Sequence, residues 1–208
     1  HKTLGRLGEG KQTFTDIDLI GYKKQQGKIK KFFEKVLNYQ PNRYVNTLFA
    51  GKRFIYYHPS SSLYVDIFFD KLEFSHDVEF GKAPGKGRLE LDYPTISLAD
   101  LVLEKIQIHE INLKDIIDLI VLFLAHPVGL MDEREKINGK YIASVLADDW
   151  GFWYDATNNL NKVKLISKEF LEKNKIEKDE YITVNERIDF LLTLIEDEPK
   201  TKRWIKRS

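Results

Sequence analysis

The sequence has 208 residues and a formal net charge of +1, with 42% hydrophobic and 31% charged residues, which indicates a globular chain of one or two domains. It contains no Cys, which excludes disulfides and thiolate zinc sites and favours a cytoplasmic protein. The longest apolar run, residues 116–125, is interrupted by Asp118 and is far shorter than the ~20 residues of a membrane span. We therefore expect no membrane partner.

The first predicted strand, residues 15–21, carries two acidic side chains one position apart. Because side chains alternate along a strand, Asp16 and Asp18 share one face, while Ile17 and Leu19 point to the core. Two carboxylates on one surface repel each other unless a cation lies between them, and Mg²⁺ prefers oxygen ligands. The spacing therefore predicts a site for Mg²⁺ (or Mn²⁺).

The next elements alternate between helical and strand patterns. Apolar residues at helical spacing predict a helix over 28–37. Aromatic and β-branched residues around a glycine predict a hairpin over 45–57, with its turn at residues 50–52. A further strand is predicted over 74–80.

The strongest strand signal in the chain is the apolar run 63–69. Its only acid is Asp66, which the alternation places on the face opposite Val65 and Ile67. An unpaired carboxylate is costly to bury, so its position in this strand calls for a partner. Together with the acids of the first strand, Asp66 would complete a platform for two metal ions and phosphoryl or nucleotidyl transfer.

A loop rich in Gly and Pro follows at residues 81–87, which we expect to be mobile, and residues 88–91 predict a last short strand. The basic side chains here are Lys82, Lys86 and Arg88. We expect them at the end of the sheet that carries the acids, where they would contact a polyanionic acceptor such as RNA. The alternative is a solvated connection without a partner.

The pattern changes from strand to helix near residues 92–96, which predicts a sheet domain over 1–96 and a helical region over 97–208. Ser97 and Asp100 have capping-box spacing and predict a helix that runs to about residue 109. Further helices are predicted over 112–126, 139–148, 150–172 and 185–196. The four histidines outside position 1 lack metal-ligand spacing and are interpreted as structural.

The order of these elements resembles the nucleotidyltransferase superfamily, which has the polymerase-β-like fold. Residues 101–107 and 112–119 are similar to helical Lys and Lys/Arg-Asp-x-x-Asp segments of AbiEii-type nucleotidyltransferases, the toxin halves of abortive-infection systems. Related uncharacterised prokaryotic proteins resemble the chain as well, and the likeness covers roughly residues 12 to 160. It implies an α+β (mixed α/β) fold, with a small mixed sheet, flanking helices and a mainly helical C-terminal half.

The resemblance also implies an activity, the transfer of an NMP from an NTP to a hydroxyl of RNA, a protein or a small molecule. Asp16 and Asp18 would bind the metal that carries the triphosphate and would share a second metal with Asp66, which would help to activate the acceptor hydroxyl. Lys105 would contact the nucleotide phosphates; alternatively it only lies along the core beside Glu104. An antitoxin-like protein is the partner that the resemblance implies.

The chain departs from the superfamily in one motif. A Gly-Gly or Gly-Ser turn usually precedes the Asp-x-Asp strand and holds the nucleotide phosphates. Here Gly5, Gly8 and Gly10 precede Asp16, but no two are adjacent and no Ser accompanies them, so the turn lies upstream of residue 1 or is absent. If it is absent, a catalytically silent module that binds a nucleotide or a partner protein is favoured. A third hypothesis is a metal-dependent nuclease that uses Asp66 and Glu79.

Two acids of the Lys/Arg-Asp-x-x-Asp segment, Asp115 and Asp118, are open to a simpler interpretation. A helix cap and pairing three residues apart on one helix explain both without chemistry.

Overall fold

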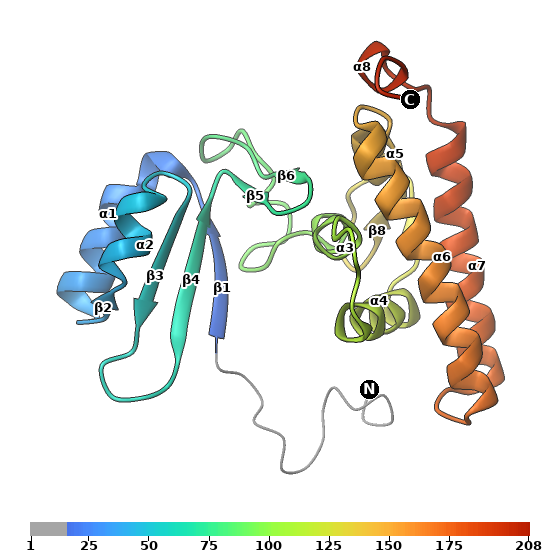
Figure 1. Cartoon of the computed structure of the whole chain (residues 1–208), viewed down its shortest axis with the longest axis horizontal. Helices are drawn as coiled ribbons and strands as arrows, with labels where there is room; N and C mark the ends of the chain where they lie inside the picture. Colours follow the sequence, from blue (N-terminus) through green and yellow to red (C-terminus); the bar gives the residue numbers. More distant parts are fainter. Residues whose placement is uncertain (1–15) are drawn as a thin grey trace. The chain divides into compact units, whose positions relative to one another are not determined.

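The computed structural model describes residues 16–208, which form two compact units. One, here called the sheet unit, consists of residues 16–73 and 77–95; the other, the helical unit, consists of residues 74–76 and 96–208. Strands dominate the first unit and helices the second, so the fold is mixed α+β (Figure 1).

A four-stranded mixed sheet forms the centre of the sheet unit. Its strands, in the spatial order β1-β4-β3-β2, are β1 (Asp16–Gly21), β4 (Tyr64–Phe69), β3 (Arg53–Tyr57) and β2 (Gln40–Pro41). Strand β1 runs parallel to β4, whereas β3 is antiparallel to both of its neighbours. The unit also contains the helical elements η2 (Lys23–Gln25), α1 (Gln26–Lys31), η3 (Phe32–Val36) and α2 (Arg43–Leu48), and a small hairpin, β5 (Lys71–Glu73) and β6 (Asp77–Glu79).

Alternation along the strands gives the sheet one apolar face, on which the first helical segment packs. Buried side chains on this face come from β3 and β4, and Phe33 of η3 packs against them together with the partly buried Ile29 of α1. The strand residues in this cluster are Phe54, Tyr56, Val65, Ile67 and Phe69. The opposite face carries Arg53 and Asp66 together with Ile55 and Phe68.

The predicted hairpin over residues 45–57 is wrong in its first half, which forms the helix α2. The side chain of Asn42 accepts a hydrogen bond from the backbone N–H of Val45 at 3.0 Å and so caps this helix. Strand β3 forms its hairpin with β4 instead. The predicted strand over residues 88–91 is also absent: this segment lies in turns, where the Arg88 N–H donates to the Phe80 carbonyl at 2.8 Å.

The helical unit confirms the capping signals read from the sequence. Ser97 and Asn112 each accept a backbone hydrogen bond at the start of a helix. The last predicted helix begins earlier than expected, at Lys178, where Glu177 and Glu180 form a capping box. The elements are α3 (Leu98–Ile106), α4 (Leu113–Ala125), β7 (Val128–Gly129), β8 (Ile137–Asn138), α5 (Gly139–Leu146), α6 (Trp150–Glu172), α7 (Lys178–Asp197) and α8 (Lys202–Ile205).

In residues 16–208, no helix combines the length and the apolar character needed to cross a bilayer.

Candidate functional site

The pairing of β1 with β4 gathers the predicted acids on one face of the sheet. Asp18 lies directly opposite Asp66 in the parallel register, and Asp16 lies two residues before Asp18 on the same side of β1. Neighbouring strands are about 4.8 Å apart, so the side chains of Asp18 and Asp66 start from adjacent positions. This is the face opposite the apolar cluster of Val65 and Ile67. We call the three residues the acidic face.

The two acids of β1 are exposed, and a tyrosine of β4 lies beside the first. The Tyr64 hydroxyl donates a hydrogen bond to Asp16 Oδ2 at 3.0 Å. This hydrogen bond, followed by partial burial and by the negative charges of all three acids, raises the pKa of Tyr64 above its ordinary value. The phenol therefore stays protonated to a higher pH than an ordinary tyrosine does.

Asp66 differs from the β1 acids because it is buried, with only 4% of its surface exposed, and holds a cation. Arg53 Nε donates to Asp66 Oδ1 at 2.8 Å and to Oδ2 at 3.1 Å, and Arg53 Nη2 also donates to Oδ2. The guanidinium lies over the Phe68 ring, 5.2 Å from its centroid. The hydrogen bond to Asp66 is the main cause that raises the pKa of Arg53, and Asp18 adds to it. Sequence analysis missed Arg53, because only the antiparallel pairing of β3 with β4 brings it to Asp66.

The donor set of the acidic face suits a hard divalent cation, since carboxylate oxygens are the ligands that Mg²⁺ prefers. Among residues 16–208, however, no group of three or more His, Cys, Asp or Glu side chains is arranged to hold a metal ion. At Asp66, both carboxylate oxygens already accept hydrogen bonds from Arg53. Asp66 is therefore available as a cation ligand beside Asp16 and Asp18 only where the Arg53 guanidinium moves.

Lys105 lies in the helical unit, in a cluster of carboxylates. Its Nζ is 3.0 Å from Asp115 Oδ1, 3.6 Å from Asp118 Oδ2 and 3.9 Å from Glu104 Oε1. Burial lowers the pKa of Lys105, but the neighbouring carboxylates and the hydrogen bond to Asp115 outweigh burial and leave the pKa raised. Asp115 and Asp118, interpreted as a cap and a helical pair, therefore also neutralise a half-buried lysine.

Residues 81–88, which we call the basic loop, contact the end of β1 that is farther from Asp16. Tyr22, directly after β1, donates from its hydroxyl to Glu90 Oε2 at 2.8 Å, and Glu90 Oε1 accepts from the Gly85 N–H at 3.2 Å. These bonds tie the loop expected to be mobile to the end of the strand. Its basic residues are Lys82 and Lys86, which are exposed, and Arg88, which is half-buried. Asp18 lies roughly 10 Å from this end along the strand, at about 3.3 Å per residue.

Asp66 and Glu79, the two acids of the nuclease hypothesis, lie on different sheets. Glu79 belongs to β6, which pairs only with β5, whereas Asp66 belongs to the four-stranded sheet.

The helical unit contains one further polar cluster that the sequence did not reveal. Asp155, 8% exposed, has His76 Nε2 at 2.8 Å from one oxygen and His109 Nδ1 at 2.8 Å from the other. The His76 ring stacks on Phe152, with centroids 4.9 Å apart. These residues are far apart in the sequence, so spacing alone gives no signal for the cluster.

Gly5, Gly8 and Gly10, the glycines that precede Asp16, lie outside the described part of the chain. Comparisons of the chain with protein-family models, with curated proteins and with solved structures found no match.

Proposed function

We propose that the protein is a cytoplasmic, metal-dependent nucleotidyltransferase that moves an NMP from an NTP to a hydroxyl of RNA, a protein or a small molecule. The observation that carries this proposal is the register of β1 and β4, which puts Asp16, Asp18 and Asp66 on one face of two adjacent strands. An antitoxin-like protein partner belongs to the same proposal through the resemblance to AbiEii-type proteins.

The proposed roles follow from exposure and hydrogen bonding. Asp16 and Asp18, exposed and adjacent to each other, would hold the Mg²⁺ that accompanies the triphosphate. Bound Mg²⁺ would neutralise the negative charge that passes to pyrophosphate. Asp66, once released by Arg53, would accept the proton of the acceptor hydroxyl, and the freed guanidinium would offer paired donors to phosphate oxygens.

The ion pair between Arg53 and Asp66 favours a second candidate function. Because Arg53 already balances the charge of Asp66, the acidic face contains an internal cation where catalysis needs a metal. A catalytically silent module that binds a nucleotide or a partner protein would keep this arrangement unchanged. The two candidates differ in a single measurable property, the formation of pyrophosphate.

The test incubates the full chain with each α-labelled NTP, Mg²⁺ or Mn²⁺, and pooled tRNA or total protein, and measures pyrophosphate release and label transfer. We expect both with at least one NTP, and we expect Asp18→Asn to abolish them while the fold is retained. The control Asp77→Asn changes an exposed carboxylate on β6 and should leave transfer intact. Pyrophosphate release that persists in Asp18→Asn, or is absent with every NTP, would reject the enzyme.

The acceptor is tested through the basic loop. If RNA is the acceptor, replacing Lys82, Lys86 and Arg88 together should reduce the log–log salt slope of tRNA binding by up to ~2–3. A matched triple substitution of exposed lysines, at Lys162 and Lys168 on α6 and at Lys173 directly after it, should leave the slope unchanged. Equal effects of the two triples would point to a protein or small-molecule acceptor.

A further inference from the structure

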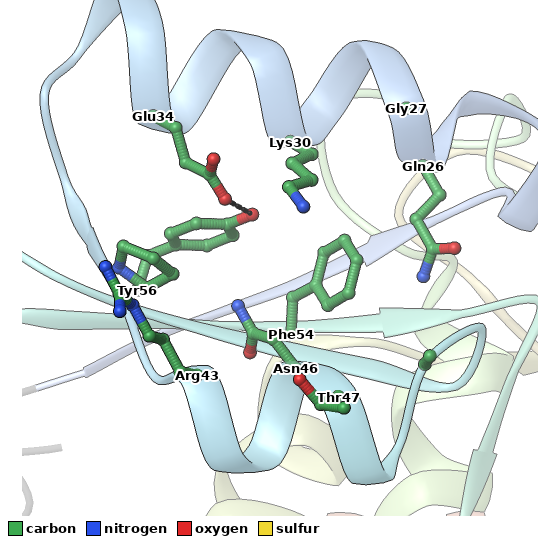
Figure 2. A pocket seen from close by; sticks show the side chains of 11 residues that line it. Gln26, Gly27, Lys30, Glu34, Arg43, Asn46, Thr47, Phe54 and Tyr56 are labelled. Atoms are coloured by element: carbon green, nitrogen blue, oxygen red, sulfur yellow. Dashed lines mark hydrogen bonds between the residues drawn. The ribbon is translucent and has the colours of Figure 1, made fainter.

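A cavity of about 570 Å³ lies within the sheet unit, on the face of the sheet opposite the acids. Helices α1 and α2 form its two walls, and β3 contributes Phe54 and Tyr56, which alternate with Arg53 and so point away from Asp66 (Figure 2). Its volume falls in the range of roughly 300–1,000 Å³ that is typical of small-molecule sites. The cavity is therefore separate from the proposed transfer site.

The lining combines two aromatic rings with two amide donors. Phe54 and Tyr56 are almost fully buried, at 6% and 0% exposure. The Nε2 of Gln26 is buried and has no hydrogen-bond partner, and Figure 2 shows its amide pointing between the two helices. Asn46 Oδ1 accepts from the Ile55 N–H at 2.7 Å, which fixes the side chain with its amide nitrogen toward the cavity (Figure 2). An unpaired buried donor costs free energy, so a ligand that accepts from Gln26 recovers it.

Charge around the cavity favours an anion with a polar end. Lys30 of α1 extends toward the cavity and Arg43 of α2 lies at its side, so two cations face one acid (Figure 2). That acid is Glu34, whose Oε1 accepts from the Tyr56 hydroxyl at 3.4 Å. A ligand here needs a negative group for the cations, acceptors for the amides, and a hydroxyl or amino group for Glu34.

We infer that this cavity binds a nucleoside monophosphate. The base would lie against Phe54, behind which the buried Tyr56 ring stacks on Phe33. The phosphate would bind Lys30 and Arg43, and ring or carbonyl acceptors would pair with Gln26 and Asn46. Glu34 would accept from a sugar hydroxyl or an exocyclic amine. A simple inorganic anion lacks the ring, and an aromatic acid lacks the donors for Glu34, so neither uses the whole lining.

The nucleotide has two possible sources, a free mononucleotide or the phosphorylated end of an RNA strand. Next to the cavity, η2, α1 and η3 carry further lysines that a longer strand would contact. These are Lys24, Lys28, Lys31 and Lys35, which line a neighbouring hollow together with Lys30.

The test is calorimetric titration of the full chain with AMP, GMP, CMP and UMP, and with adenosine and inorganic phosphate as partial ligands. We expect saturable binding of at least one monophosphate, tighter than both partial ligands. Lys30→Met should weaken it by about tenfold or more, since a hydrogen bond to a charged group is lost. Lys31→Met makes the same charge change on the same helix, but Lys31 does not line the cavity, so affinity should stay within about twofold.

The variant Gln26→Leu tests whether the Gln26 side chain binds the ligand or only stabilises the fold. Leu is similar in size and removes a buried donor that has no partner, so urea stability should be unchanged or raised while the affinity for the nucleotide falls. Absence of saturable binding by all four monophosphates, equal losses in Lys30→Met and Lys31→Met, or full affinity in Gln26→Leu would each overturn the inference. A 5′-phosphorylated oligonucleotide then identifies the source. Tighter binding than the mononucleotide, lost in Lys31→Met, supports an RNA end, and equal or weaker binding supports the free nucleotide.

Discussion

Replacing Arg53 tests two roles of the acidic face separately, its contribution to the stability of the fold and its binding of a cation. In the metal-free protein it is the hydrogen-bonded cation of Asp66, which is only 4% exposed. Arg53→Met keeps an apolar stem that can still pack on Phe68, but it removes the charge and the donors. The variant therefore leaves a buried carboxylate without its cation, beside the two acids of β1.

The size of the effect follows from how much of the pair water reaches. Breaking a fully buried ion pair by removing one partner costs ~3–5 kcal/mol. The Arg53 side chain is 37% exposed and that of Asp66 only 6%, so the pair is screened on one side. We expect Arg53→Met to lower the free energy of unfolding by about 2–3 kcal/mol. Lys52→Met is the matched control, because Lys52 forms an exposed pair with Glu73 at 2.9 Å and should cost under ~1 kcal/mol.

The assay is urea denaturation of wild type and both variants, with EDTA or with Mg²⁺. Without Arg53 the three carboxylates attract a divalent cation more strongly, so Mg²⁺ should stabilise Arg53→Met more than it stabilises the wild type. The reasoning is refuted if Arg53→Met costs no more than Lys52→Met. Equal stabilisation of both proteins by Mg²⁺ would refute the competition between Arg53 and the cation.

Three further predictions concern other contacts. Lys105→Met should lower the free energy of unfolding in urea by about 3 kcal/mol, because it leaves Asp115 and the neighbouring carboxylates without their cation. The control Lys173→Met, at an exposed ion pair, should lower it by under ~0.5 kcal/mol. Similar values for the two variants would show that the Lys105 ion pairs do not stabilise the fold. The pKa of Tyr64 is raised in the folded protein, so as pH rises the unfolded chain, with the ordinary value of 10.0, loses the phenol proton first. The contribution of the protonated Tyr64 to stability is therefore complete below pH 10 and is lost as pH rises through the pKa of Tyr64 in the folded protein. Tyr64→Phe should therefore flatten the fall of stability above pH 10, and an unchanged profile would contradict this. Asp155→Asn should lower stability by about 1–2 kcal/mol, since one imidazole loses its acceptor, and a neutral result in denaturation would show that the cluster contributes nothing.

Local signals in the sequence were sufficient for most of the helical unit and for the shared face of Asp16 and Asp18. The prediction that Ile17 and Leu19 point to the core was wrong, because both side chains are exposed. Ser97 and Asn112 mark helix starts because a side-chain oxygen satisfies a backbone N–H that the helix leaves free. Asp16 and Asp18 share a face because the strand period is two, and this holds for any partner strand. That Asp66 joins them depends on register, which alternation in the two separate segments could only suggest.

The failures arise where one local preference opposes another or where the partner is remote. Residues 43–48 contain aromatic and β-branched side chains typical of strands, yet the cap at Asn42 and the packing of α2 against β3 make them helical. Arg53, 13 positions from Asp66, and the cavity between α1 and α2 both depend on tertiary packing. His76 and Asp155 are 79 positions apart, and no pattern in the sequence connects them.

The central claim, that the acids of β1 and β4 form a cation site, is tested most directly by binding of Mn²⁺ measured by electron paramagnetic resonance. We predict that the wild type binds Mn²⁺, that Mg²⁺ competes for the site, and that Asp16→Asn and Asp18→Asn each weaken binding strongly while Asp77→Asn does not. Mn²⁺ affinity that is the same in all four proteins would contradict the account.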